Sequence, residues 1–175
     1  MPVRRAETCW RGSEDGMAKF RLLARGVLRS GRCILLAHNK RRSHTFLPGG
    51  RVALGESAPE ALRREFREET GLRVRVIRFL GAVEHRCRRG GIQTYEVNLI
   101  FQVSCAKARA GRDVRSRESH LEFLWREIGS LGAARLKPQP LRRRIPLALG
   151  ARGSVIWAST LKRRVRAARS GRVSG

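Results

Sequence analysis

The chain has 175 residues and a mass of 19.8 kDa, which suits one ordinary domain with short extensions. Lys and Arg total 39 against 14 Asp and Glu, which gives a net charge of +25. This charge favours nucleic acid, phosphorylated substrates or an anionic surface as partners. The alternative is that the chain is rich in Arg for compositional reasons and has no such partner. The hydrophobic content of 41% excludes wholesale disorder, and the lack of a long apolar run predicts no membrane span.

The N-terminal segment differs in character from the rest of the chain. Residues 1–16 contain three acids and no apolar stretch, so they resemble neither a signal peptide nor a transit peptide. Periodic apolar sequence begins at Met17, which is itself a candidate start of the native chain. We expect a disordered extension over residues 1–18. The four cysteines form no C-x-x-C pair and no cysteine–histidine spacing typical of zinc sites, which indicates a reduced, cytoplasmic setting.

The first half of the chain predicts a β-hairpin and then a helix. Residues 22–28 and 33–38 are short β-favouring runs, and the turn between them contains a glycine. A proline and two glycines then mark an irregular loop. Ser57 suits an N-cap, Pro59 the first helical turn and Gly71 the position after the last turn. We therefore expect a helix from Pro59 to about residue 70.

The second half predicts further strands. Residues 74–79, 93–103 and 121–125 show β-favouring or alternating patterns, and a basic loop over residues 84–91 joins the first two. A helix-spaced apolar stripe from residue 141 is cut short by a proline. Strands on both sides of one charged helix predict a mixed α/β, or α+β, domain.

The C-terminal residues 150–175 are basic and contain no acid. Trp157, Leu161 and Val165 fall on one helical stripe flanked by arginines. We expect this tail to form a basic amphipathic helix that docks on the domain, meets nucleic acid or lies on an anionic surface, or else to be a frayed, solvated segment.

Residues 50–72 contain most of the chemistry-bearing groups. They read GRVALGESAPEALRREFREETGL and come directly after Leu-Pro-Gly. On a helix, Glu65, Glu68 and Glu69 are related by i, i+3 and i+4, so they share one face. Three carboxylates packed together repel each other, and hard divalent cations such as Mg²⁺ or Mn²⁺ take oxygen ligands of this kind. Arg64 precedes Glu68 by four residues and can orient and partly neutralise a carboxylate.

Every specified position of the Nudix box is present in this segment, so the sequence resembles the Nudix hydrolase family, of the MutT-like kind, over roughly residues 19–149. The resemblance implies an α/β/α sandwich with a mixed β-sheet. It also implies Mg²⁺ or Mn²⁺ as cofactor and hydrolysis of a nucleoside diphosphate linked to another group, by attack of water at phosphorus. The metal ligands it implies are Gly50, through its carbonyl, and Glu65, Glu68 and Glu69. Glu56 is expected to support them through Arg64.

The general base is left open by the sequence. Glu65 or Glu68 is the first choice, and Glu118 is the best candidate outside the box because it precedes a predicted strand, as the later family glutamate tends to do. Glu96 and Glu122 are weaker candidates. Together with Arg64, the catalytic set is therefore Glu65, Glu68 and Glu118.

The resemblance implies a nucleotide-type small molecule as substrate, and it selects no particular one, because the sequence lacks the markers of the ADP-ribose, dinucleoside polyphosphate and NADH hydrolases. Phe46 is expected either to stack on a base or to belong to the core, and Gly49 lets the backbone approach a phosphate closely. Arg86 is expected to bind extra phosphates or to lie in a solvated loop.

Two other functions remain as alternatives. The basic tail favours removal of a pyrophosphate or cap from the 5′ end of RNA. A non-catalytic nucleotide-binding or RNA-binding domain is the third hypothesis, although such a domain needs no complete glutamate cluster. Related domains are often dimers, so a homodimer is a further expectation.

Overall fold

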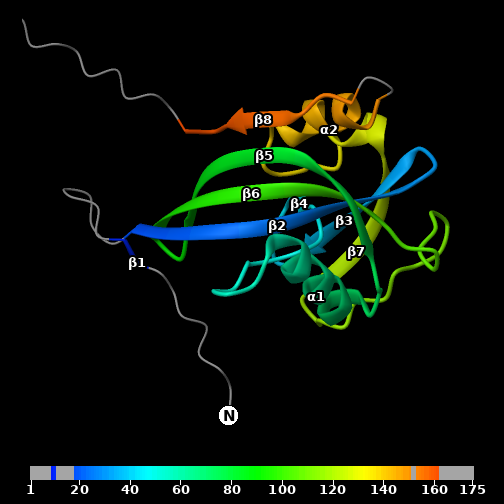
Figure 1. Ribbon diagram of the computed structural model, residues 1–175, viewed down its shortest axis with the longest axis horizontal. Coiled ribbons are helices and arrows are strands. Elements are labelled where there is room, and N and C mark those ends of the chain that lie inside the picture. The colour runs from blue at the N-terminus through cyan, green and yellow to red at the C-terminus, as the bar shows by residue number, and fades with distance from the viewer. Residues whose placement is uncertain (1–8, 11–17, 151–152, 162–175) are drawn as a thin grey trace, which may run out of the picture.

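The computed structural model describes residues 9–10, 18–150 and 153–161. Figure 1 shows the elements in their spatial arrangement. In chain order they are β1 (Cys9–Trp10), β2 (Ala18–Ser30), β3 (Cys33–Asn39), β4 (Thr45–Phe46), α1 (Ala58–Thr70), β5 (Arg75–Arg89), β6 (Ile92–Ser104), β7 (Leu121–Glu127), a short 3-10 helix (Ile128–Ser130), α2 (Leu141–Leu149) and β8 (Ile156–Ser159).

The strands form a mixed sheet in the order β4-β3-β2-β6-β5-β8, with β1 added to β2 and β7 added to β3. Strands β2 and β6 run parallel over residues 18–28 and 93–103, whereas β5 and β6 are antiparallel. Helices α1 and α2 lie on opposite sides of the strands (Figure 1). The α/β/α sandwich with a mixed β-sheet is therefore confirmed.

Each helix covers its own hydrophobic core. Leu62 and Phe66 of α1 are fully buried in the core on one side of the sheet. Leu141 and Ile145 of α2 are buried with Ile156 of β8 on the other side. Burying a side chain of this size contributes about 1.5–3 kcal/mol, so these contacts fix both helices to the sheet.

The ends of α1 agree with the predicted signals. Ser57 is the N-cap, its hydroxyl accepts the backbone N–H of Glu60, and the Glu60 carboxylate accepts the backbone N–H of Ser57 in return. This reciprocal capping box satisfies two helix-end donors. Gly71 ends the helix with a φ of 73°, a left-handed conformation that glycine adopts without strain. Because α1 carries the carboxylate cluster, these caps also fix the position of that cluster in the fold.

The predicted basic loop over residues 84–91 is wrong. Strand β5 continues to Arg89, and the turn is confined to Gly90 and Gly91. Polar and basic residues favoured the loop interpretation, but both faces of this part of β5 tolerate polar groups. His85 and Cys87 face a pocket, whereas Arg86 is exposed and does not line it.

The sheet extends beyond both predicted domain boundaries, residues 19 and 149. Strand β1 pairs with β2 inside the expected N-terminal extension, and β8 pairs in parallel with β5 inside the expected basic tail. A helix beginning at Trp157 is therefore wrong: Ile156 is buried and Trp157 exposed, the alternation of a strand. Four residues are too few to separate a strand period from a helix period. Residues 162–175, which contain the rest of the predicted stripe, lie outside the described residues.

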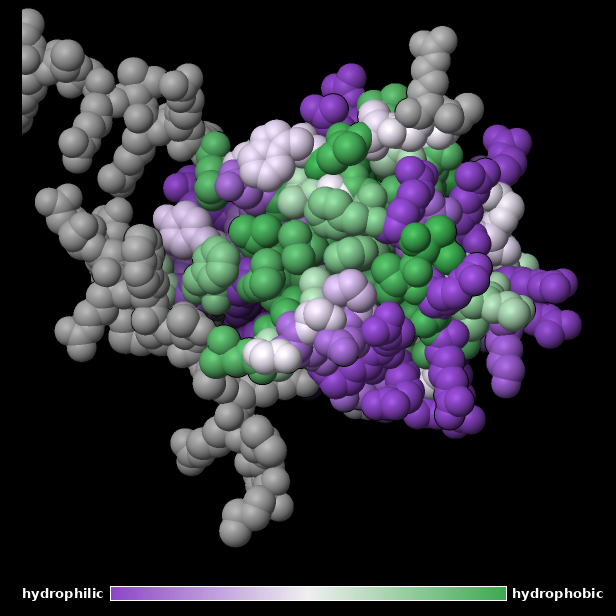
Figure 2. All heavy atoms as spheres, in the orientation of Figure 1, coloured by the Kyte–Doolittle hydropathy of each residue, from purple (hydrophilic) through white to green (hydrophobic). Residues whose placement is uncertain are grey.

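One face of β2, β5 and β6 carries partly exposed apolar side chains, and the other face of β6 carries buried polar residues beside its core residues. Figure 2 shows apolar side chains gathered over the middle of the face formed by β2, β5 and β6. Phe20, Phe79 and Tyr95 on this face are partly exposed. On β6, Thr94 and Glu96 alternate with Tyr95 and are buried on the inner side. Within the described residues, neither α1 nor α2 has the length and apolar character needed to cross a membrane.

The ion pair between His38 and Glu122 predicts a pH-dependent stability. The hydrogen bond to Glu122, at 2.7 Å, raises the pKa of His38 above its ordinary value. Its stabilising effect is therefore complete below the unfolded pKa and is lost as pH rises through the folded pKa. We expect the free energy of unfolding of wild type to exceed that of His38→Gln by more at about pH 5.5 than at about pH 9. The change in this difference should be less than about 1 kcal/mol, because the pair is partly exposed. Urea unfolding at both pH values measures this, and a difference that does not change with pH would contradict it.

Candidate active site

The loop before α1 is fixed to β2 by backbone hydrogen bonds. The N–H groups of Gly26 and Ala24 donate to the carbonyls of Pro48 and Gly50, each at 2.9 Å. The loop therefore continues the sheet edge and meets the first turns of α1 at a defined place. This places the glycine pair beside the helix face that carries the carboxylates.

Two glycines let the loop approach the helix closely. A Cβ atom at Gly50 would overlap the carboxylate of Glu65. Gly49 has a φ of 117°, and its N–H donates to a carboxylate oxygen of Glu69 at 3.3 Å. A larger residue at either position would push the backbone away from the carboxylates, so the loop and the helix form one compact cradle.

The carboxylate cluster lies on one face of α1, as the spacing predicted. Glu65 and Glu69 are buried, with 7% and 6% of their surface exposed, and Glu68 lies at the exposed rim. Two buried acids so near each other are costly without compensation. The cluster is thus a place where positive charge stabilises the fold.

Arg64 connects three acids of the site. Its guanidinium donates to both oxygens of Glu56 at 2.8 and 3.0 Å, to Glu65 at 2.9 Å and to Glu68 at 3.0 Å. A further N–H donates to the carbonyl of Arg51 at 3.0 Å. These bonds raise the pKa of Arg64 above its ordinary value, so it stays charged. The predicted contact between Glu56 and Arg64 is therefore present, and the same arginine orients two carboxylates of the cluster.

Arg64→Lys is expected to lower kcat by about 10- to 100-fold, because one ammonium cannot replace the bidentate bond to Glu56 while also contacting Glu65 and Glu68. Steady-state kinetics at saturating divalent cation measures this. Arg63→Lys is the matched control, since Arg63 is exposed on the same helix. Equal rates for the two variants would contradict a positioning role for Arg64.

Burial controls the protonation of Glu69. Its pKa is raised to about 7, mainly by desolvation; Arg25 and the Gly49 N–H oppose this rise, whereas the nearby Glu65 and Glu118 add to it. At neutral pH this carboxyl is thus only partly ionised on its own. A bound cation would favour the ionised form, which is the behaviour expected of a metal ligand.

A pocket of about 590 Å³ opens in front of the cluster. Its lining includes Glu65, Glu69 and Gly49 together with Phe46. Of the predicted residues outside the box, Glu118 also lines it. Of the two weaker base candidates, Glu96 lines the pocket. Glu122, paired with His38, is not part of the lining.

Glu118 reaches the pocket from the segment before β7. Its carboxylate lies 3.3 Å from His120 Nε2, and it is close enough to Glu69 to raise the pKa of that residue. The neighbouring Arg117 N–H donates to the carbonyl of Glu69 at 2.8 Å. This backbone bond connects the segment to α1, so Glu118 stands in a position consistent with the predicted general base.

Arg86 does not line the pocket, contrary to its predicted role in substrate binding. It is exposed on β5 and alternates with His85 and Cys87, which face the pocket. The error comes from the loop interpretation of this segment, because a strand sends successive side chains to opposite faces. Arg88, nearer the end of the strand, is among the lining residues.

Arg25 is a site residue that the sequence interpretation missed. It donates to the carbonyl of Leu47 at 3.2 Å and to that of Gly49, and its guanidinium lies 5.3 Å from the centre of the Phe46 ring. It lines the pocket and stabilises the ionised form of Glu69. An arginine within the apolar run of residues 22–28 was the available signal.

The residues present fit a hard divalent cation. Glu65 and Glu69 supply oxygen ligands at the pocket wall, and Glu68 lies beside them on the same helix face. The carbonyl of Gly50 accepts the N–H of Ala24, but a carbonyl oxygen has a second lone pair, so coordination is still open to it. The loop passes so close to the Glu65 carboxylate at Gly50 that no side chain fits between them.

The NUDIX domain family matches residues 20–146, so the chain belongs to this family. An ADP-ribose pyrophosphatase from Methanocaldococcus jannaschii is 34% identical over 98 residues, which cover 53% of this chain and 57% of that protein. The chain thus spans little more than half the length of this curated relative.

Solved structures share the fold. The MutT protein from Methanosarcina mazei Go1 is 22% identical, with a TM-score of 0.56 over 73% of this chain and 91% of that one. A MutT protein from Bacillus halodurans is 16% identical, with a TM-score of 0.59 over 77% of this chain and 85% of that one. At these identities the likeness concerns the fold alone.

Proposed function

We propose that the protein hydrolyses the pyrophosphate linkage of a nucleoside diphosphate derivative, with Mg²⁺ or Mn²⁺ as cofactor. The observation that carries the proposal is the buried pair Glu65 and Glu69 behind a two-glycine loop, at the wall of a pocket large enough for a nucleotide. Family membership supports the same reaction class.

The proposed roles depend on the position of each side chain. Glu65, Glu68, Glu69 and the Gly50 carbonyl would hold the cation. When bound, the cation neutralises the pyrophosphate oxygens and lowers the pKa of the attacking water. Arg64 keeps the carboxylates oriented through its bonds to Glu65 and Glu68.

The proton of the attacking water needs a carboxylate acceptor. Glu65, Glu68 and Glu118 remain the candidates, and the pocket position of Glu118 supports it without excluding the other two. Attack at phosphorus breaks one P–O bond of the anhydride and gives two phosphate-bearing products.

The pocket supports a substrate with an aromatic base and a charged diphosphate. Phe46 offers a ring face, although Arg25 already lies over it, so stacking of a base requires the opposite side of the ring or its edge. The similarity to an ADP-ribose pyrophosphatase supports a nucleotide sugar as substrate. Nucleoside triphosphates remain in the same proposed class.

The test is a product screen with nucleoside triphosphates and nucleotide sugars in the presence of Mg²⁺ or Mn²⁺, comparing wild type with Glu69→Gln. We expect turnover of at least one compound by wild type and a loss of about 100-fold or more in the variant. An unchanged rate in the variant would show that the site is assigned wrongly. Nucleotide binding without turnover in either metal would favour the non-catalytic alternative.

A further inference from the structure

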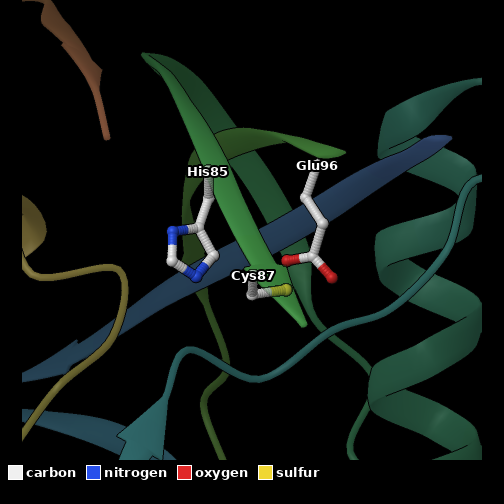
Figure 3. A group of neighbouring side chains, drawn as sticks. All are labelled: His85, Cys87 and Glu96. Atoms are coloured by element: carbon white, nitrogen blue, oxygen red, sulfur yellow. The ribbon is translucent and has the colours of Figure 1, made fainter. Parts of the chain in front are cut away.

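Strands β5 and β6 bring a histidine, a cysteine and a glutamate together outside the Nudix box. His85 is directly opposite Glu96 in the antiparallel register, and Cys87 lies two residues further along the same face of β5. One ligand atom from each lies within 4.8 Å of the other two. Figure 3 shows the thiol beside the carboxylate, and one imidazole nitrogen turned to the side of Cys87.

Thr160 contacts the Nδ1 side of the His85 ring. The Thr160 hydroxyl has one proton, and the Glu84 carbonyl at 3.4 Å can only accept it. The same oxygen accepts the N–H of Arg86 at 3.0 Å, and it lies 3.0 Å from His85 Nδ1. Either group can donate across the contact between Thr160 Oγ1 and His85 Nδ1. When Nδ1 donates, the lone pair of the neutral ring is on Nε2, the nitrogen that a metal ion would take.

The tautomer with the proton on Nδ1 is the one that suits a metal-binding histidine. Such a residue donates one ring N–H to an oxygen and presents its other nitrogen to the ion. Here the oxygen comes from the segment directly after β8, so the C-terminal part of the sheet orients a side chain of β5.

We propose that His85, Cys87 and Glu96 bind one zinc ion. A thiolate is a soft ligand that selects zinc over Mg²⁺, and an imidazole with a carboxylate completes a three-ligand set that tetrahedral zinc accepts. All three residues line the pocket that also contains Glu65 and Glu69, so the fourth position faces the pocket. That position would be open to a water molecule or to an oxygen of a molecule bound in the pocket.

The distances require only a small closure. Zinc bonds of about 2.0–2.3 Å hold tetrahedral ligand atoms roughly 3.3–3.8 Å apart, so side chains within 4.8 Å of each other must approach by about 1 Å. His85 and Cys87 are half-buried and Glu96 is buried. Zinc binding requires rotations of these side chains to supply a shift of this size.

The site is distinct from the one formed by the box glutamates. Those residues supply only oxygen ligands from α1 and its preceding loop, whereas this site has nitrogen, sulfur and oxygen ligands from the sheet. The inference does not rest on the proposed hydrolysis, because it concerns a different ion bound by different residues.

The experiment is a Co²⁺ titration of the full chain after removal of bound metal, with Co²⁺ replacing zinc. Thiolate coordination gives a charge-transfer band in the near ultraviolet that oxygen ligands do not produce. We expect this band to saturate at one equivalent in wild type, to disappear in Cys87→Ser and to be displaced by Zn²⁺. It should remain in Cys33→Ser, another half-buried thiol, and in Glu68→Gln.

A second variant tests the orientation of the histidine. Thr160→Val removes the hydroxyl and should weaken Co²⁺ binding by about 10- to 100-fold while the band is retained at saturation. Thermal unfolding of metal-free Cys87→Ser shows whether that variant folds. If it does not, Thr160→Val still tests the proposed site.

Three results would overturn the proposal: no thiolate band in wild type, a band that persists in Cys87→Ser, or unchanged affinity in Thr160→Val. The readout needs no turnover, so it is independent of the proposed hydrolysis. An inactive protein with the band would refute the hydrolysis alone, and an active protein without it would refute the zinc site alone.

Discussion

Replacing Glu65 with Gln is expected to lower kcat by about 100- to 10,000-fold, the range associated with loss of a catalytic acid or base. Gln preserves the size of the side chain and an oxygen that can accept from Arg64. It removes the negative charge that a divalent cation needs and the group that would take a proton from water. Steady-state kinetics with saturating Mg²⁺ measures the effect.

The same substitution should leave the fold intact. Glu65 and Glu69 are both buried, and the charge of Glu65 disfavours ionisation of Glu69, so removing the charge at position 65 relieves repulsion. We expect the free energy of unfolding, measured in urea without metal, to be equal to that of wild type or higher. Glu127→Gln, at an exposed position outside the pocket, is the matched control and should be fully active. Full activity of Glu65→Gln would contradict the proposed site.

Gly49→Ala is expected to cause the largest loss of stability. Its φ of 117° costs a residue with a Cβ about 1–3 kcal/mol. The new Cβ would also overlap the backbone carbonyl of Ala24, which cannot rotate away, and would lie 2.8 Å from a methyl group of Leu62. We expect the free energy of unfolding to fall by about 3 kcal/mol or more, and activity to fall with it as the loop leaves Glu69.

Gly55→Ala separates the cost of a positive φ from the cost of steric overlap by the added Cβ. Gly55 also has a positive φ, 78°, but an added Cβ would meet no atom within 4 Å. Its cost should therefore be the conformational part alone, about 1–2 kcal/mol. Denaturant unfolding of both variants measures the difference. Similar losses in the two would show that the close approach of the loop to β2 contributes little.

The sequence predicted the parts of the site that lie close together along the chain. Ser57, Gly71 and the spacing of the three glutamates are local signals, and the bounds and charged face of α1 agree with them. The contact between Arg64 and Glu56 was also foreseeable, because one helix and one short loop connect them.

The rest of the site depends on pairing between distant strands. Glu96 and His85 belong to alternating polar residues whose face cannot be assigned until the β5–β6 register is known. Arg25 lies within an apolar run, where the local pattern gives no sign of a site residue. Arg86 lies in a strand, whereas the sequence pattern predicts a loop, so the direction of its side chain is not predicted correctly. Short edge strands such as β8 form because a partner backbone is available, which local patterns do not reveal.

The central claim is that Glu65, Glu68 and Glu69 support attack of water on phosphorus. Hydrolysis of an accepted nucleotide derivative in water labelled with heavy oxygen, with mass spectrometry of both products, tests it directly. We predict one labelled oxygen in one phosphate-bearing product, formed only with Mg²⁺ or Mn²⁺ and lost in Glu69→Gln. Cleavage that leaves the label out of both phosphates, or that continues at the wild-type rate in a metal chelator, would contradict the claim.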